Sequence, residues 1–111
     1  MPALRDIDPT DLAVLVRAVP ELLGHLTRLA DDGLDFVLHV LDGLFGAYDV
    51  TITSLRGDLV VATLTLKVRP EDERTRCVLL LIWVRQIRES QDRWWRRIAL
   101  RQKALGLPEL A

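Results

Sequence analysis

The sequence is poor in several residue types on which particular structures depend. Cys77 is the only cysteine, so no disulfide can form within the chain, and its apolar surroundings predict a buried thiol. Asparagine is absent, and only two of the 15 basic residues are lysine. The longest apolar run, from Cys77 to Val84, has eight residues. That is far short of the roughly 18 to 20 that cross a bilayer. The first residues also lack the basic start and apolar stretch of a secretory signal. These absences predict a cytoplasmic protein that does not enter a membrane.

The composition is that of a globular chain. Half of the 111 residues are hydrophobic and 28% are charged, which is enough apolar material for one core and too much for a disordered chain. No internal repeat, low-complexity tract or linker divides the sequence. We therefore predict a single domain over residues 1–111.

The charges are unevenly distributed along the chain. Residues 1–50 contain nine acidic residues against three arginines, whereas residues 51–111 contain 12 basic residues against seven acidic ones. Such an asymmetry can orient a protein towards a partner or towards a second copy of itself.

A helix is expected from Asp8 onwards, because Asp8 can cap free N–H groups and Pro9 suits the first helical position. Its apolar residues recur with a helical period at Leu12, Leu15, Val16, Val19, Leu23, Leu26 and Ala30. Pro20 interrupts this stripe without changing its phase. The pattern therefore predicts either one helix kinked at Pro20 or two helices that abut there.

A second amphipathic helix is indicated by Leu34, Val37, Leu38, Leu41 and Phe45, and Gly43 or Gly46 would end it. The period then changes to two. Val50 and Ile52 alternate with threonines, residues 56–58 provide a tight turn, and apolar and polar residues alternate again over 60–68. This pattern is typical of a β-hairpin.

The segment from Pro70 to Val84 has two readings. Pro70 followed by three acidic residues would open a helix well, and one long helix to Leu105 would give the order α-α-β-β-α. However, residues 77–84 are apolar all round, which favours a strand of a sheet covered on both faces. We therefore predict a strand over Thr75–Val84 and a last, amphipathic helix from Gln86 to Leu105. The result is an α+β fold in the order α-α-β-β-β-α, with an antiparallel three-stranded meander.

Residues that would support catalysis or metal binding are scarce. His25 and His39 have no second ligand at zinc spacing and read as solvated surface residues, and Asp31, Asp32 and Asp35 lack the pattern of a calcium loop. No phosphate-binding or dinucleotide motif is present. We predict no catalytic residue, no cofactor and no metal, which favours a protein that is not an enzyme without excluding one.

The last helix carries the strongest candidate site. Its partner-binding or nucleic-acid-binding candidates are Arg93, Trp95, Arg96, Arg97, Arg101 and Lys103. Arginines beside aromatic rings suit both phosphate contacts and base stacking. The competing interpretation is a solvated ladder of ion pairs at four-residue spacing, such as Arg85 with Glu89 and Asp92 with Arg96. Trp94 shares the phase of Ile98 and is expected in the core.

These features favour a non-catalytic interaction protein, acting as an adaptor, regulator or inhibitor of another macromolecule. A homodimer is expected because a small chain with a strand apolar on both faces leaves surface to cover, and an acidic protein is the expected partner. The alternative is a nucleic-acid-binding protein that uses the same helix. A third hypothesis places a small-molecule pocket over the sheet, with Tyr48 or His39 as polar groups beside it.

Overall fold

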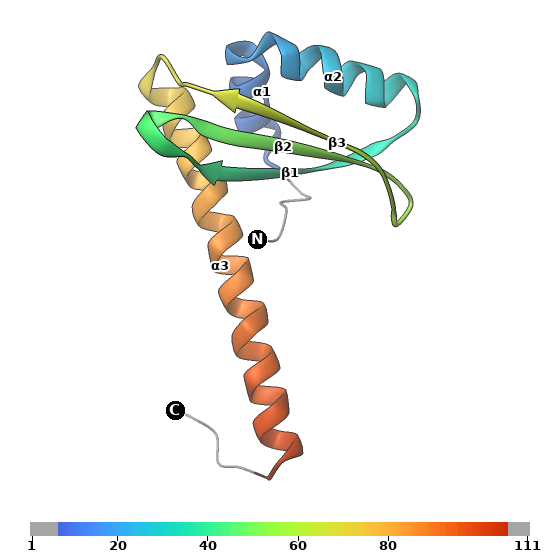
Figure 1. Cartoon of the computed structure of the whole chain (residues 1–111), viewed down its shortest axis with the longest axis vertical. Coiled ribbons are helices and arrows are strands. Elements are labelled where there is room, and N and C mark those ends of the chain that lie inside the picture. The colour runs from blue at the N-terminus through green and yellow to red at the C-terminus, as the bar shows by residue number, and fades with distance from the viewer. Residues whose placement is uncertain (1–6, 107–111) are drawn as a thin grey trace.

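The computed structural model describes residues 7–106 and confirms the order α-α-β-β-β-α (Figure 1). A three-stranded sheet lies against two N-terminal helices and the first half of a long C-terminal helix. The elements are α1 (Pro9–Ala18), α2 (Pro20–Asp31), β1 (Asp35–Asp42), a short 3-10 turn (Leu44–Gly46), β2 (Tyr48–Arg56), β3 (Leu59–Val68) and α3 (Glu73–Ala104).

Helices α1 and α2 abut at Val19, as the sequence allowed. The Asp8 carboxylate accepts a hydrogen bond from the N–H of Thr10 at 2.7 Å and so caps α1. Val19 leaves helical geometry, with φ −126° and ψ 88°, and Pro20 then begins α2. Proline has no N–H to give to the preceding turn, so the chain ends one helix and starts another there.

The strands form an antiparallel meander in the order β1-β2-β3. The register pairs Leu38 with Ile52 and Val40 with Val50, and all four side chains are buried on the inner face of the sheet. Gly57, at φ 62°, makes the turn between β2 and β3, and the predicted hairpin over this region is confirmed. The alternation of apolar and polar residues along the strands thus indicates which face of the sheet packs against the helices.

The helix predicted over Leu34–Phe45 is wrong, because this segment is β1 and the turn that follows it. A short apolar run fits both periods, and Leu38 and Val40 satisfy the strand period equally well. The segment forms a strand because pairing with β2 buries both side chains. Gly43 accordingly serves a strand turn, where its N–H bonds to the Ala47 carbonyl at 2.8 Å.

The strand predicted over Thr75–Val84 is also wrong, because these residues form the first turns of α3. Asp72 caps the helix by accepting a hydrogen bond from the N–H of Thr75 at 2.7 Å. A segment that is apolar all round would need cover on every side to be fully buried. The helix buries Leu79 and Ile82 and leaves Leu81 and Val84 48% and 43% exposed. One side of the apolar segment therefore remains uncovered.

Helix α3 is much longer than the sheet it packs on. Its 32 residues extend for about 48 Å at 1.5 Å per residue. The last of its buried residues is Gln86, and beyond it the helix projects away from the rest of the molecule (Figure 1). We call residues 7–86 the head and residues 87–105 the stem.

The two edge strands of the sheet differ in whether another part of the chain contacts their backbone. Gln86 is fully buried at the edge of β1, where its side-chain amide donates to the Val40 carbonyl at 2.9 Å and accepts from the Val40 N–H at 2.8 Å. The side chain thus imitates a neighbouring strand at Val40 and satisfies both backbone groups of that residue at the edge. Strand β3 forms the other edge, and its first residues Leu59, Val60 and Val61 are exposed.

Candidate interaction surface on the stem

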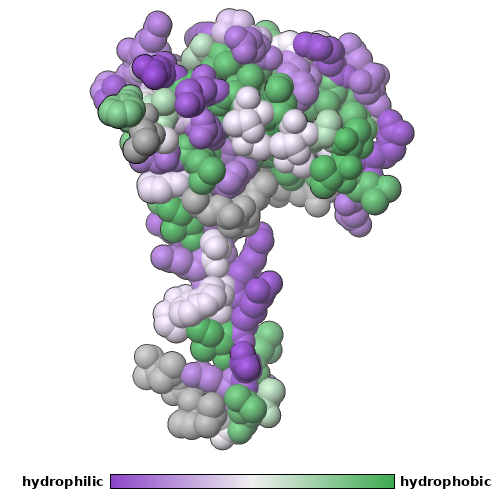
Figure 2. Space-filling view, viewed as in Figure 1, coloured by the Kyte–Doolittle hydropathy of each residue, from purple (hydrophilic) through white to green (hydrophobic). Residues whose placement is uncertain are grey.

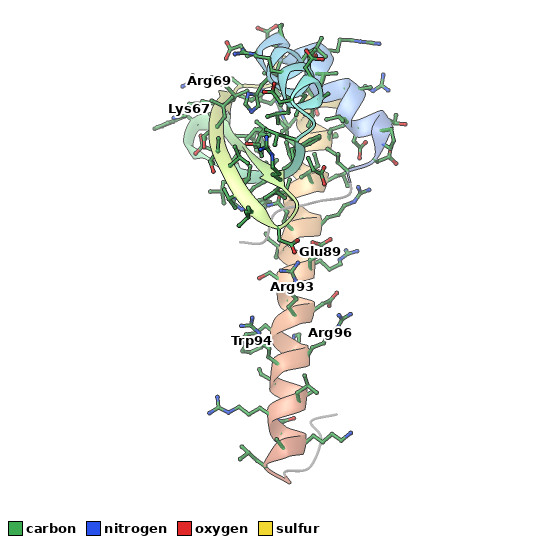
Figure 3. The ribbon with its side chains drawn as sticks, turned by 90° about the vertical axis from the view of Figure 1, so that its right-hand side faces the viewer. Lys67, Arg69, Glu89, Arg93, Trp94 and Arg96 are labelled. Atoms are coloured by element: carbon green, nitrogen blue, oxygen red, sulfur yellow. The ribbon has the colours of Figure 1, made fainter. Side chains whose placement is uncertain are left out.

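The stem separates the six candidate residues onto two sides. All six are exposed. At about 100° per residue, Arg93, Arg96, Arg97 and Lys103 share one side of the helix, which we call the basic flank. Trp95 and Arg101 lie on or beside the opposite, more apolar side. Figure 3 shows Trp94 and Arg96 projecting in opposite directions from the stem.

The basic flank is not neutralised by neighbouring acids. Among the described residues, no ion pair includes Arg93, Arg96, Arg97 or Lys103. The ion pairs of the competing ladder are therefore not formed among the described residues. Arg85 instead reaches Asp11 of α1 at 3.5 Å, because burial of Gln86 turns this part of α3 towards the head. In the space-filling view, hydrophilic side chains follow one edge of the upper stem while paler ones cover the other (Figure 2).

A row of mainly apolar residues follows the other side of α3 at alternating spacings of three and four, the spacing of a coiled-coil contact line. We call this row the seam. Its members are Cys77, Leu80, Val84, Ile87, Gln91, Trp94, Ile98, Arg101 and Leu105. It starts on the head and continues to the end of the stem.

Two predictions about seam residues are wrong. Trp94 is 57% exposed and lies outside the core, because the sheet ends before α3 reaches it. Cys77 is exposed rather than buried, because it lies on the side of α3 that faces away from the sheet. The rings of Trp94 and Trp95 pack edge to face, with centroids 4.9 Å apart. An indole in such an exposed position is typical of a surface that a partner covers.

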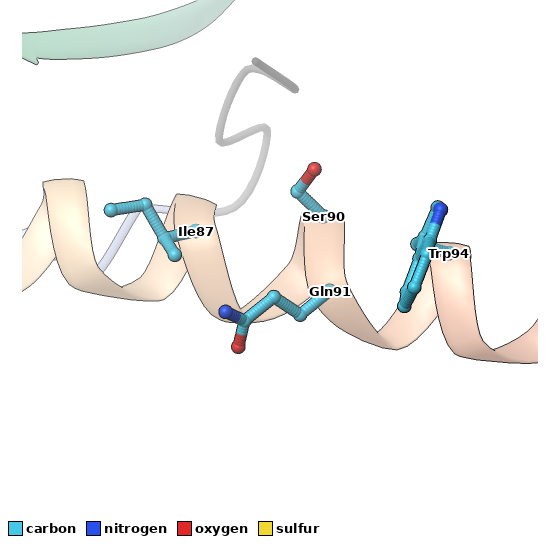
Figure 4. A pocket seen from close by; sticks show the side chains of 4 residues that line it. All are labelled: Ile87, Ser90, Gln91 and Trp94. Atoms are coloured by element: carbon cyan, nitrogen blue, oxygen red, sulfur yellow. The ribbon is translucent and has the colours of Figure 1, made fainter.

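A shallow groove interrupts the seam at its midpoint. Its volume is about 330 Å³, and Ile87, Ser90, Gln91 and Trp94 line it (Figure 4). Apart from one serine and one amide, the lining is apolar. No general acid, general base or nucleophilic pair is present in the lining, so the groove is suited to receiving a side chain rather than to catalysis.

A second recess lies on the head, where α1 meets the loop before α3. Its volume is about 300 Å³, and its lining includes Arg17, Arg69, Glu71 and Asp72. Hydrogen bonding to the N–H of Thr75 holds the pKa of Asp72 below its ordinary value, as expected for a helix cap. The lining is polar, unlike the apolar pocket of the third hypothesis. Neither Tyr48 nor His39 lines the recess or the groove.

His39 belongs to β1 and not to a helix surface, so its predicted setting is wrong. It alternates with the buried Leu38 and Val40 and therefore lies on the outer face of the sheet, paired with Thr51. Its Nε2 atom is inaccessible and has no hydrogen-bond partner among the described residues. Burial lowers the pKa of His39 below its ordinary value of 6.5.

This lowered pKa predicts that acid destabilises the fold. Below pH 6.5 the unfolded chain protonates its histidine more readily than the folded chain does. The contribution of His39 is thus complete above about pH 6.5 and is lost as the pH falls through the folded pKa. We expect the free energy of unfolding to fall less between about pH 7.5 and about pH 5.5 in His39→Gln than in the parent. Urea denaturation at both values checks this, and equal pH dependences would contradict it.

Within residues 7–106, no three His, Cys, Asp or Glu side chains gather as they would around a metal ion. Every helix in this part of the chain is too short or too polar to cross a membrane.

Comparisons with models of known protein families, with curated proteins and with solved structures find no significant match.

Two functional features were missed in the sequence. The sequence predicts one apolar face of the last helix at Ile87, Trp94, Ile98 and Leu105, with Gln91 on its flank. The continuation of the seam to Cys77, Leu80 and Val84 is lost because a strand is predicted over residues 75–84. Its alternating spacing of three and four is nevertheless readable from Cys77 to Leu105. The role of Gln86 left no such signal, because it depends on the distant Val40 backbone, 46 residues away.

Proposed function

We propose that the protein is a non-catalytic interaction protein whose basic flank binds an acidic surface of another protein. The observation that carries this proposal is the arrangement of Arg93, Arg96, Arg97 and Lys103. These four exposed cations share one side of a helix that stands clear of the head, and no described acid pairs with them. A partner can bind unpaired cations on an exposed helix without first breaking any ion pair within the chain. An adaptor, regulator or inhibitor would use such an element.

An acidic protein surface fits the flank better than a nucleic acid does. Single-stranded nucleic acids are bound where cations and stacking aromatic rings share one groove. Here only Arg101 shares the side of the two tryptophans, and the cations of the basic flank lie elsewhere, as Trp94 projecting away from Arg96 illustrates (Figure 3). Four cations spread over residues 93–103 extend only about 15 Å along the helix, a short footprint for a nucleic-acid backbone. Nucleic-acid binding remains the second candidate because the stem as a whole carries six basic residues against two acidic ones.

Fluorescence anisotropy tests both candidates in one format. The probes are a labelled polyglutamate peptide and labelled single- and double-stranded oligonucleotides, at about 50 and about 200 mM salt. We expect the peptide to bind. We also expect the double variant Arg93→Glu/Arg96→Glu to raise its Kd at least about tenfold, or ~1.4 kcal/mol.

The matched control is Arg28→Glu/Arg56→Glu, which makes the same charge change at two exposed arginines of the head. Equal weakening by the control would show that net charge, and not the basic flank, drives binding. Oligonucleotide binding that is tighter than peptide binding and collapses at the higher salt would replace the proposal with the nucleic-acid alternative. No binding of any probe at the lower salt would overturn both.

A further inference from the structure

We infer that a second copy of this chain packs along the seam of α3 in the antiparallel direction. This inference concerns the side of the stem opposite the basic flank and does not depend on what the flank binds. The seam needs a partner because most of it is apolar and, apart from Leu80, which packs partly against the core, it is at least partly exposed to solvent. Val84, Trp94 and Leu105 are 43%, 57% and 65% exposed. Contiguous apolar surface of this kind is rare on a monomer.

The spacing of the seam identifies a helix as the partner. In a two-helix coiled coil, apolar residues recur alternately three and four positions apart on each helix. From Cys77 to Leu105 every position of that repeat is present, and only Gln91 and Arg101 are strongly polar. A polar side chain at one such position commonly fixes the register of a coiled coil. Gln91, at the centre of the seam, can have that function.

The groove on the seam has the composition of a coiled-coil packing site. In such interfaces, one side chain of each helix inserts into a hole formed by four residues of the other helix. For a contact centred on Gln91, these four are Ile87, Ser90, Gln91 and Trp94. The same four line the groove (Figure 4). The free surface therefore already has the hollow that a side chain from a second helix would fill.

Charge selects a second copy and sets its direction. The stem has six basic residues against two acidic ones, whereas residues 7–86 of the head have 12 acidic residues against eight basic ones. In a parallel pair the two Arg101 side chains of the seam would face each other, which is unfavourable. An antiparallel pair centred near Gln91 keeps them about 30 Å apart and brings each stem, with its net positive charge, next to a head with a net negative charge. It also covers Val84 and Leu81 of the head with the stem of the partner.

The surface is large enough for a stable dimer. Residues 77–105 extend for about 42 Å, and a specific interface needs about 1,000 Å² of total buried surface. The four exposed indoles of Trp94 and Trp95 in two copies offer on the order of several hundred Å² of that area. The apolar residues of the seam on each copy supply the remainder.

Sedimentation equilibrium at micromolar concentrations tests for the dimer. We expect the full chain to have about twice its monomer mass of 12.6 kDa. Ile98→Glu places a charge in the seam and should yield monomers. The matched control is Leu100→Glu, which makes a similar change at a residue that is 67% exposed but outside the seam, and it should stay dimeric. Circular dichroism verifies that each variant is folded.

Cysteine cross-linking then tests the direction. In a parallel pair the two Cys77 thiols would face each other and oxidise to a disulfide. In an antiparallel pair centred near Gln91 they lie about 40 Å apart and cannot. We expect no cross-link in the parent and efficient cross-linking in Cys77→Ser/Gln91→Cys, whose new thiols lie near the two-fold axis.

Three outcomes would overturn the inference. These are a monomeric parent, an Ile98→Glu variant that remains dimeric, and a disulfide between the Cys77 thiols of the parent. Peptide binding by the Ile98→Glu monomer separates this inference from the proposed function, because Arg93 and Arg96 are unchanged in it. A monomer that still binds polyglutamate would leave the proposed function intact even if the parent proved monomeric.

Discussion

Replacing Gln86 by methionine should lower the free energy of unfolding by about 3 kcal/mol. Methionine has a similar length and volume, so packing changes little, but both hydrogen bonds to Val40 are lost. The N–H and carbonyl of Val40 then remain buried without partners, and each such group costs about 1–3 kcal/mol. Few single substitutions outside the apolar core of this chain should have a comparable effect.

Urea denaturation followed by tryptophan fluorescence measures this loss. Gln102→Met is the matched control, because Gln102 lies on the stem and its side chain forms no hydrogen bond with another described residue. The control should change the free energy of unfolding by less than about 0.5 kcal/mol. A Gln86→Met variant as stable as its control would mean that the edge of β1 is satisfied in some other way.

Replacing Leu79 by alanine should lower the free energy of unfolding by about 2–5 kcal/mol. The same change at Leu81 should lower it by less than about 1 kcal/mol. Leu79 is fully buried against the sheet, whereas Leu81 is 48% exposed on the other side of α3. Two residues of separation correspond to about 200° on a helix but return to the same face on a strand. The pair therefore distinguishes the two structures considered for residues 75–84.

Both alanine variants are best measured in the Ile98→Glu background, so that association along the seam makes no contribution. Denaturation curves then report the fold alone. Nearly equal losses at the two positions would contradict the helical assignment, because residues 79 and 81 of a strand share one face. A large loss at Leu81 alone would show that the side of α3 containing Leu81, and not the side containing Leu79, packs against the sheet.

The features that the sequence predicted correctly are those with local causes. Asp8 and Pro9 mark a helix start through cap chemistry, and Pro20 ends a helix because it has no N–H to donate. The hairpin was readable from strict alternation about the Gly57 turn. Each of these depends on neighbours within a few residues, so a single sequence contains the necessary information.

The two misassigned segments have a common physical origin. Residues 34–45 and 75–84 are short apolar runs whose spacing fits both periods, and contacts far away in the sequence decide between them. Val40 pairs with Val50 of β2, and Leu79 packs in the core. The order α-α-β-β-β-α is nevertheless confirmed. Residues 34–45 supply a strand instead of the predicted helix, residues 75–84 supply helix instead of the predicted strand, and the break at Pro20 gives two N-terminal helices.

The candidate residues of the last helix follow from composition, because its surplus of arginines is visible in the sequence. The structure exposes all six candidates and places Arg93, Arg96, Arg97 and Lys103 on one side of α3. To see that these residues lie on a different side from Trp95 and Arg101, the helix must be known to run continuously through residues 75–84. The predicted strand over those residues hid that continuity. Once α3 is known to be continuous, the helix period alone assigns each residue to its side.

The hydrogen bonds of Gln86 also bear on the synthesis of the chain. Val40 leaves the ribosome 46 residues before Gln86, and at 5–20 residues per second that interval lasts roughly 2 to 9 seconds. β2 and β3 are made during this interval, and for the last 18 residues of it the complete sheet has unpaired backbone groups at both edges. Neighbouring chains on one polysome are then exposed to strand pairing with each other. The first half of α3 thus ends a period of vulnerability that every newly made copy passes through.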